Sequence, residues 1–450
     1  MEKKSRILKS AFILGVGAVV AKILGAAYRI PLTNLIGGYG LGLYQTVFPV
    51  YVILLDFAGA GVPNAVSKII SSDRSHGGAT ALGYLKDSVK LLSVIGFVFS
   101  VALALCGRII ARLQGNESAY ISYILLAPSV FLVAIISCYR GYFQGLSDMK
   151  PTAVSQIIEQ AFKLVFGLAF AAMFLPDVNK SVSGAVLAIT VSEFAALMFL
   201  IIYAKRKNEG LSGAVKSGKF FIHAKEIIKN AVPVTLTGMA IPFSHFIDSF
   251  LIVNVLSTYL SNATSLYGIF SGVGATVVNL PVSVCYAVAV ATIPAVASSE
   301  NLNESKAARD KALTLTFFLS VAGCLVCYFL SDKIIDVLFS RLVGAEKYTA
   351  VKVLKYSSFS VIFLSLLQTE NAVLFGSGNL YGSLIGVFSG IAVKVLLSFL
   401  LIKNPALNIY GAVIAQTACY FLASLINLKQ VFRSKDENKV ATYRKLTTIQ

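Results

Sequence analysis

The chain is poor in the residues that most enzymes use for chemistry. It has only three histidines among 450 residues, and they are scattered at His76, His223 and His245. The sequence shows neither a glycine loop with phosphate-binding spacing nor an acidic pair beside a plausible metal cluster. We therefore expect no enzyme activity, no metal and no organic cofactor.

Cysteine is also scarce. All six cysteines lie within apolar stretches, and only Cys324 and Cys327 have the CxxC spacing. No histidine, aspartate or glutamate lies near that pair in its apolar run, so the spacing does not predict a zinc site. A disulfide framework is not indicated either.

Charge is sparse for a chain of this length. Only 13% of the residues are charged, 56% are hydrophobic and the mean hydropathy is +0.77, which is more apolar surface than a soluble domain can bury. The net charge of +18 would suggest nucleic acid in a soluble protein, but here the basic residues lie between apolar blocks. The composition predicts an all-α integral membrane protein without a nucleic-acid partner.

The apolar blocks are long enough to cross a bilayer, whose core of about 30 Å needs roughly 20 residues of helix. We predict twelve spans, near 9–32, 41–62, 88–112, 120–143, 152–175, 182–204, 229–257, 265–297, 311–331, 351–374, 381–402 and 408–430. The amino-terminal segment lacks a small-residue cleavage site and is expected to be the first helix. In the eighth span, Pro281 and several glycines are expected to kink or break the helix.

Lysine and arginine cluster in the loops of one side, which predicts the orientation. The clusters lie at 3–9, 68–86, 205–229, 306–311 and 429–445. That side should be the cytoplasm, with both termini inside, and its loops should contact anionic lipids. The opposite loops are short except for 332–352, which carries charges of both signs.

The two halves of the chain resemble each other. Residues 143–148 parallel 374–379, Lys163 then falls on Lys394, and 183–188 parallel 410–415. Ordered matches of this kind predict two six-helix lobes related by a pseudo-twofold axis along the membrane normal. The predicted parts are an amino-terminal lobe (1–204), a basic linker (205–228), a carboxy-terminal lobe (229–430) and a basic tail (431–450).

Ionisable groups inside a bilayer are costly, so those within spans point to an interior site. In the fifth span, Gln156, Glu159, Gln160 and Lys163 fall on one face of an otherwise apolar helix. The alternative is an internal Glu159–Lys163 pair, one turn apart, that only joins helices.

Other spans carry single polar groups. They are Lys22 and Arg29 in the first, Gln45 and Asp56 in the second, Arg140 and Gln144 in the fourth, His245 and Asp248 in the seventh, Glu370 in the tenth and Lys394 in the eleventh. A guanidinium such as that of Arg140 suits a phosphate because it is planar and donates two parallel hydrogen bonds. Alternatively, Lys22 and Arg29 snorkel to the interface and Arg140 anchors a helix end. Paired lysines at 163 and 394 would attract an anion.

Two segments carry a family resemblance. Residues 22–72, KILGAAYRIPLTNLIGGYGLGLYQTVFPVYVILLDFAGAGVPNAVSKIISS, and 138–160, CYRGYFQGLSDMKPTAVSQIIEQ, resemble SpoVB-type proteins, the stage V sporulation protein B group. This group belongs to the multidrug, oligosaccharidyl-lipid and polysaccharide exporter superfamily and is related to MurJ lipid II flippases.

The resemblance implies two MATE-like lobes that open alternately to each face of the cytoplasmic membrane. The implied substrate is an undecaprenyl-pyrophosphate-linked saccharide, such as peptidoglycan lipid II or another envelope polysaccharide precursor, carried by a monomer. Many members have two further carboxy-terminal helices, and with twelve spans we expect either that the lipid tail is held elsewhere or that the substrate differs.

The resemblance also implies roles for the residues above. The pyrophosphate would be held by Arg29, Arg140, Lys163 and Lys394, with Lys22 and Lys68. Saccharide groups would bond to Gln45, Gln144, Gln156 and Gln160, and charge balance or coupling to Na⁺, H⁺ or the membrane potential would involve Asp56, Glu159, Asp248 and Glu370. Two alternatives remain open: an antiporter for organic cations, whose site should be acidic and aromatic, and a non-transporting scaffold for envelope synthesis.

Overall fold

The structure is a computed structural model of the 450-residue chain. It describes residues 2–57, 61–72, 78–207, 224–225, 227–228, 235, 239–297, 299 and 302–433, and these contain helices but no strand. Among them, ten helices are long and apolar enough to cross a membrane. The predicted all-α membrane fold is confirmed.

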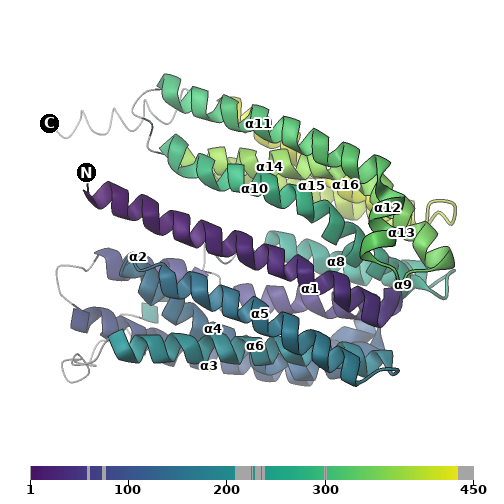
Figure 1. Ribbon diagram of the computed structural model, residues 1–450, viewed down its shortest axis with the longest axis horizontal. Helices are drawn as coiled ribbons and strands as arrows, with labels where there is room; N and C mark the ends of the chain where they lie inside the picture. The colour runs from purple at the N-terminus through teal and green to yellow at the C-terminus, as the bar shows by residue number, and fades with distance from the viewer. Residues whose placement is uncertain are drawn as a thin grey trace. The chain divides into compact units, whose positions relative to one another are not determined.

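Helix α1 (Glu2–Leu55) is a hairpin of two helical arms (Figure 1). Gly37 has φ 69° and ψ −174°, a backbone conformation that favours glycine, and it interrupts the helix there. In a straight helix Tyr28 and Tyr44 would lie about 24 Å apart, yet their ring centroids are 6.3 Å apart. The two arms are therefore antiparallel and correspond to the first two predicted spans.

The remaining spans agree well with the prediction. With α1 divided at Gly37, and with the shorter apolar helix α8 (Ala240–Leu256) added to the ten candidates, each of the twelve predicted segments overlaps one of these helices. Most of the first ten residues of the predicted span 229–257 lie outside the described residues. The match reflects the length of the apolar runs, because each run must satisfy its backbone hydrogen bonds internally across the bilayer.

The chain divides into two compact units, and each is described by itself. Unit 1 comprises residues 1–257 and 262–268, and unit 2 comprises 258–261 and 269–450. The predicted linker falls largely outside the described residues, and the predicted lobe boundaries stay a prediction.

Unit 1 is built from α1, α2 (Gly61–Ser72), α3 (Gly78–Leu113), α4 (Tyr120–Gly145), α5 (Lys150–Met173), α6 (Val178–Lys207), α8 and α9 (Ala263–Gly268). Its core contains fully buried aromatic side chains, among them Tyr123 and Phe143. Polar contacts attach α8 to the other helices: the Gln114 amide donates to Ser249 Oγ at 2.6 Å, and Asn254 donates to the Leu113 carbonyl at 2.8 Å.

The helix of the eighth predicted span, 265–297, is interrupted, but not at Pro281. A π-helical turn, η4 (Ile269–Gly274), separates α9 from α10 (Ala275–Ala297), and Pro281 lies within α10. The break coincides with glycines at 268, 272 and 274. A side chain on Gly268 would collide with the backbone of Gly38 and Gly42, so this glycine permits close packing of α9 on the α1 hairpin.

Unit 2 consists of η4, α10, α11 (Leu302–Phe329), α12 (Ser331–Leu338), α13 (Gly344–Ser357), α14 (Phe359–Gly376), α15 (Leu380–Ile402) and α16 (Ile409–Arg433). The connection predicted over 332–352 between two spans is mostly helical, because α12 and α13 occupy most of it. Both helices carry charges and, with 8 and 14 residues, are too short to cross a bilayer.

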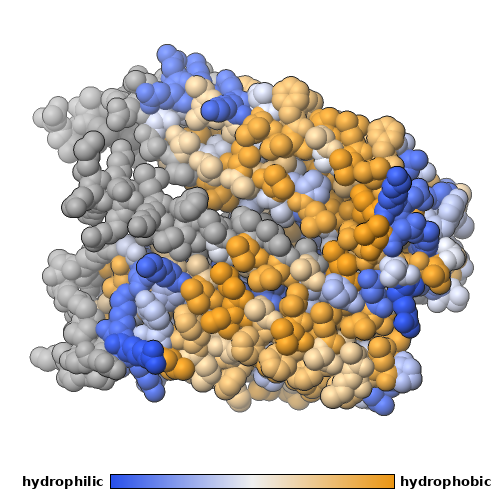
Figure 2. All heavy atoms as spheres, in the orientation of Figure 1, coloured by the Kyte–Doolittle hydropathy of each residue, from blue (hydrophilic) through white to orange (hydrophobic). Residues whose placement is uncertain are grey.

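Large apolar side chains remain exposed on the membrane helices, for example Val94, Leu105 and Phe318. In the face shown by Figure 2, hydrophobic residues cover the sides of the helices and hydrophilic residues gather toward their ends. A surface of this kind is stable in hydrocarbon and not in water.

Candidate functional site

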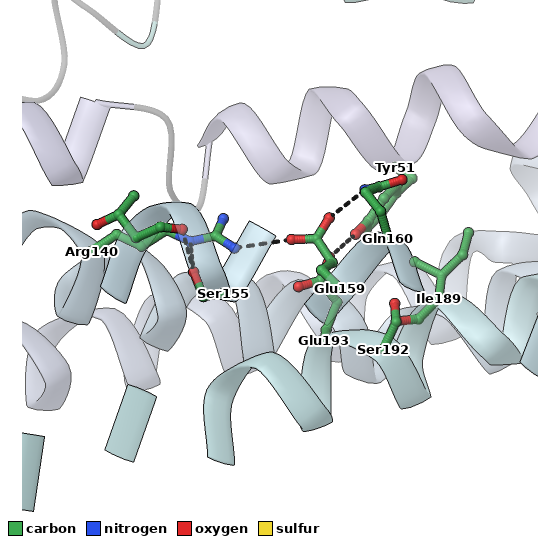
Figure 3. A network of polar contacts seen from close by, with 9 residues as sticks. Tyr51, Arg140, Ser155, Glu159, Gln160, Ile189, Ser192 and Glu193 are labelled. Carbon is green, nitrogen blue, oxygen red and sulfur yellow. Dashed lines mark hydrogen bonds and ion pairs between the residues drawn. The ribbon is translucent and has the colours of Figure 1, made fainter. Parts of the chain in front are cut away.

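A network of polar side chains joins α4 to α5 in unit 1 (Figure 3). The Arg140 guanidinium donates from Nε to Ser155 Oγ and from Nη2 to Glu159 Oε2, both at 3.0 Å. Gln160 Nε2 donates to the other oxygen of Glu159, also at 3.0 Å. The side chains of Arg140 and Glu159 are only 16% and 18% exposed, so this is a largely buried ion pair.

The partner of Glu159 differs from the one the sequence suggested. The i, i+4 pair with Lys163 is not formed, and among the described residues the ion-pair partner of Glu159 is Arg140 of α4. The reading of Glu159 and Lys163 as a simple structural pair was therefore wrong. Glu159 instead links two helices and holds the guanidinium in place.

A second carboxylate lies beside this network and was missed by the sequence reasoning. Glu193 of α6 is 3% exposed, and Tyr51 of α1 donates to its Oε1 at 3.0 Å (Figure 3). Its Oε2 is buried without a hydrogen-bond partner among the described residues. The sequence did contain a signal for Glu193, because it is an acidic residue inside an apolar span. The same criterion selected Glu159.

Two further cations of unit 1 contact aromatic rings. The guanidinium carbon of Arg29 lies 5.4 Å from the Phe48 ring centroid, and Lys163 Nζ lies 5.9 Å from that of Tyr28. Within the described part of the chain, no carboxylate lies within ion-pair distance of either cation. Cation–π contacts offset only part of the cost of holding a charge in the membrane.

Helix packing positions these groups. On α5, Gly167 follows Lys163 by one turn, and a Cβ at Gly167 would meet the Tyr28 ring at 2.6 Å. On α4, Gly141 follows Arg140, and a Cβ there would meet Pro63 of α2 at 2.8 Å. These glycines allow close helix approach, as small residues commonly do in membranes.

The other predicted residues of unit 1 are more dispersed. Gln45 is buried, Gln144 and Asp56 are partly buried, and Lys68 is exposed on α2. Gln156 lies on α5 with its buried Oε1 lacking a partner among the described residues. The side chain of Lys22 lies outside the described residues.

Asp248 lies on α8 and is paired with a histidine. Its Oδ2 is 3.6 Å from Nδ1 of His245, one turn earlier on the same helix, and its side chain is buried. Asp248 and His245 were both selected from the sequence.

Unit 2 holds Glu370 and Lys394, both almost fully buried, at 1% and 2% exposure. Ser424 of α16 donates to Glu370 Oε1 at 2.8 Å. A neutral cluster adjoins it in sequence, in which Asn371 Oδ1 accepts hydrogen bonds from Ser383 at 2.5 Å and from Asn427 at 2.7 Å. The sequence reasoning did not select this amide cluster.

Chemically, the site of unit 1 is a mixed-charge network with a cationic excess. Its cations are Arg29, Arg140 and Lys163, and its carboxylates are Glu159 and Glu193. When all five groups are ionised one positive charge is left over, so the network favours an anion over a cation.

Comparison with known protein families assigns the chain to one of them. Residues 7–300 match the model of a family described as polysaccharide biosynthesis protein. The chain belongs to this family. Its predicted kinship with SpoVB-type and MurJ-type members of the exporter superfamily is thereby confirmed.

Individual relatives agree with this assignment. The lipid II flippase MurJ of Bacillus subtilis is 27% identical, over 94% of this chain and 81% of the relative. Stage V sporulation protein B of the same organism is 26% identical, over 95% and 84% of the two chains. Among solved structures, an inward-facing multidrug resistance MATE family transporter of the same superfamily has a TM-score of 0.77 at 15% identity and covers 93% of this chain and 96% of its own. This last likeness confirms the two-lobed fold.

Proposed function

We propose that the protein is a flippase that carries a lipid-linked saccharide, bearing an anionic pyrophosphate, across the cytoplasmic membrane for envelope polysaccharide or peptidoglycan synthesis. Membership of the polysaccharide biosynthesis family and the likeness to a lipid II flippase support this proposal. The substrate remains a proposal at the level of its chemistry: a polar saccharide, an anionic linkage and a lipid.

The observation that carries the proposal is the presence of Arg29 and Lys163 within membrane helices without a carboxylate partner among the described residues. Cations inside membrane segments normally pair with an acid or serve a pathway for an ion or substrate. A pyrophosphate would supply the missing negative charge and accept hydrogen bonds from both side chains.

Arg140 would take part by exchanging partners. In the structure its Nη2 donates to Glu159. An arriving phosphate would compete with that carboxylate for the guanidinium, and the unpartnered Oε1 of Gln156 would accept a hydrogen bond from a saccharide hydroxyl. Differential contacts of this kind let substrate shift the balance between states open to opposite faces of the membrane.

The direct test is flipping of a lipid-linked saccharide by the purified chain in proteoliposomes. Replacing Arg140 and Lys163 together by alanine should reduce the rate at least about tenfold, the equivalent of ~1.4 kcal/mol. The matched control replaces Arg108 and Lys180, two exposed cations of the same unit, by alanine and should leave the rate unchanged. Equal rates for the two double variants would disprove the assigned roles.

A cellular test complements this assay. The chain should restore growth to a strain deficient in lipid II flipping and should remove the precursor that accumulates on the cytoplasmic leaflet. Repeating the liposome assay with imposed Na⁺, proton or voltage gradients would identify the coupling, which we propose to involve one of the three.

A further inference from the structure

Two membrane helices of unit 2 end at the same level, and aromatic rings mark that level. The candidate span on α11 ends at Phe329, and the one on α14 begins at Phe359. The ring of Tyr328 lies 5.8 Å from the ring of Phe359, which places the two helix ends side by side. Aromatic residues are common where the hydrocarbon of a membrane meets the lipid headgroups. The hydrocarbon therefore ends near Phe359 at this end of unit 2.

Helix α13 carries two lysines just beyond this level. Figure 1 shows α12 and α13 at the end of unit 2 where α11 finishes. Lys355 and Lys352 precede Phe359 by one and two helical turns, which is about 6 and 10 Å along a helix. The headgroup layer on each side of a bilayer is about 5–8 Å thick. Both ammonium groups, on flexible side chains, therefore reach the depth of the lipid phosphates.

Neither lysine is neutralised by an acid. Lys352 Nζ lies 4.3 Å from the ring centroid of Tyr348, and Lys355 Nζ lies 4.8 Å from that of Tyr328. Among the described residues, no carboxylate lies within ion-pair distance of either ammonium group. A cation–π contact holds a cation in place but leaves its charge uncancelled. Two positive charges are therefore available to a ligand here.

Tyrosine hydroxyls lie close to these charges. Tyr348, Lys352 and Tyr356 follow one another at four-residue spacing, so they share one face of α13. Tyr348 is 61% exposed and Tyr356 is 46% exposed. The Tyr356 ring also lies 5.7 Å from that of Tyr410, at the start of α16. This face thus presents ammonium and hydroxyl donors, the groups that bind an anion.

Apolar side chains adjoin the donors on the membrane side. Phe329 is 73% exposed, Leu330 is 42% exposed and Phe359 is 47% exposed. Figure 2 shows hydrophilic residues at this end of unit 2 next to the hydrophobic side of α11. A small anion in water gains nothing from exposed apolar surface, whereas the acyl chains of a lipid cover it favourably. The neighbouring surface therefore favours an anion that carries a lipid tail.

We propose that this lysine–tyrosine face, formed by Tyr348, Lys352, Lys355 and Tyr356, binds an anionic phospholipid. The phosphate accepts hydrogen bonds from the two ammonium groups and from the hydroxyls, and the acyl chains lie along Phe359 and its neighbours. A zwitterionic lipid is a poorer ligand, because its own cation cancels its phosphate and leaves both lysines unbalanced. The face lies at the ends of α11 and α16 opposite the predicted basic loops, so it is separate from the lipid contacts expected there.

The test uses the absence of tryptophan from the chain, because one introduced tryptophan then reports on the lipid beside it. The reporter is Phe359→Trp, whose fluorescence is quenched by lipids brominated high on their acyl chains. The full chain is reconstituted into mixtures of phosphatidylglycerol and phosphatidylcholine, with one or the other lipid brominated. We expect phosphatidylglycerol to be preferred at least about fivefold, the effect of a single lysine at a lipid surface. A second reporter, Phe318→Trp, in the middle of α11 and 65% exposed, should show no preference.

Three double variants in the Phe359→Trp background locate the site. Lys352→Gln with Lys355→Gln removes both charges and should abolish the preference. Lys352→Arg with Lys355→Arg keeps both charges and should retain it. The control, Lys333→Gln with Lys347→Gln, removes the same net charge from α12 and α13 and should retain the preference, because Lys333 lies on α12 and Lys347 is already paired with Asp336.

Four results would overturn the proposal: equal quenching by the two lipids, the same preference at Phe318→Trp, a preference that survives the double glutamine variant, or an equal loss in the control. The first would leave a water-soluble anion, such as an acidic polysaccharide, as the ligand of this face. The last would show that net charge attracts the lipid, not this face.

Thermal unfolding shows whether each variant folds. If Phe359→Trp does not fold, Phe329→Trp at the end of α11 takes its place. If the double glutamine variant does not fold, the comparison with Phe318→Trp still decides the outcome. Because no flipping is measured, failure here is distinguishable from failure of the proposed function.

Discussion

The ion pair between Arg140 and Glu159 predicts a strong energetic coupling that can be measured directly. Removing one partner of a buried pair leaves an uncompensated charge and typically costs about 3–5 kcal/mol. Because these two side chains are 16% and 18% exposed, we expect Arg140→Leu to cost about 3 kcal/mol, toward the low end of that range. Glu159→Gln should cost less, because the new amide can still accept a hydrogen bond.

A double-mutant cycle isolates the pair from other effects of each substitution. Arg140→Leu also removes the hydrogen bond to Ser155. Both variants that contain leucine at position 140 lack this bond, so its loss cancels from the coupling energy. The double variant should be less destabilised than the sum of the two single variants by about 2 kcal/mol. Arg140→Lys should fall between wild type and Arg140→Leu, because an ammonium keeps the charge but cannot reproduce the fork geometry of the guanidinium.

The measurement is unfolding by sodium dodecyl sulfate of the protein in mixed micelles. Circular dichroism is the suitable signal, because the chain contains no tryptophan. The matched control is the pair of Arg108 and Glu117, whose side chains are 62% and 47% exposed. Its cycle should show no resolvable coupling. Additive costs for Arg140 and Glu159 would refute the buried pair and, with it, the partner exchange proposed for an arriving phosphate.

Three further predictions test other parts of the structure. Tyr51→Phe removes the hydroxyl that donates to Glu193 and should cost about 1–3 kcal/mol in the same unfolding assay; no change would show that Glu193 has another partner. Gly268→Ala should destabilise unit 1 by at least about 1–3 kcal/mol, because the added methyl collides with the backbone of α1; wild-type stability would contradict this packing. Outside the spans, hydrogen bonds from the backbone N–H and then the side chain of Lys180 lower the pKa of Asp177. This stabilisation is present above the unfolded value of about 4 and is lost as pH falls through the lower folded value. The protection factor of the Lys180 amide, which is its exchange rate relative to the intrinsic rate at the same pH, should therefore fall in that acid range in wild type but not in Asp177→Asn.

The helices could be predicted because a membrane span depends on a property local to the sequence, the length of an apolar run. The turn at Gly37 lies between the predicted spans 9–32 and 41–62, because the apolar run is interrupted there. Helix α12 and the first half of α13 could not be found this way, since they are short, charged and lie outside the long apolar runs; the second half of α13 falls within the predicted span 351–374. Their helicity depends on packing and local hydrogen bonds, to which a hydropathy window is blind.

The site was predictable in its members but not in its pairing. Glu159 and Lys163 share a helix face, and sequence spacing alone suggests that they pair. The structure joins Glu159 to Arg140, 19 residues earlier. Which cation reaches which carboxylate depends on how α4 packs on α5, and helix spacing carries no information about that contact.

The predicted internal repeat pairs residues of different charge in the two halves. On the register that pairs Lys163 with Lys394, Arg140 of α4 corresponds to Asn371 of α14. Arg140 forms an ion pair with Glu159, whereas Asn371 accepts hydrogen bonds from the neutral groups of Ser383 and Asn427. A neutral amide cluster can join helices but attracts an anion weakly, because it carries no net charge.

The consequence is a division of chemistry between the halves. The cations that lack an ion-pair partner among the described residues, Arg29 and Lys163, lie in unit 1 together with the Arg140–Glu159 ion pair, while unit 2 carries the neutral amide cluster around Asn371. Substitutions that remove cations from unit 1 should therefore reduce flipping of an anionic substrate more than Asn371→Ala does. In the proteoliposome assay, an equal loss of flipping for Lys163→Ala and Asn371→Ala would contradict this division.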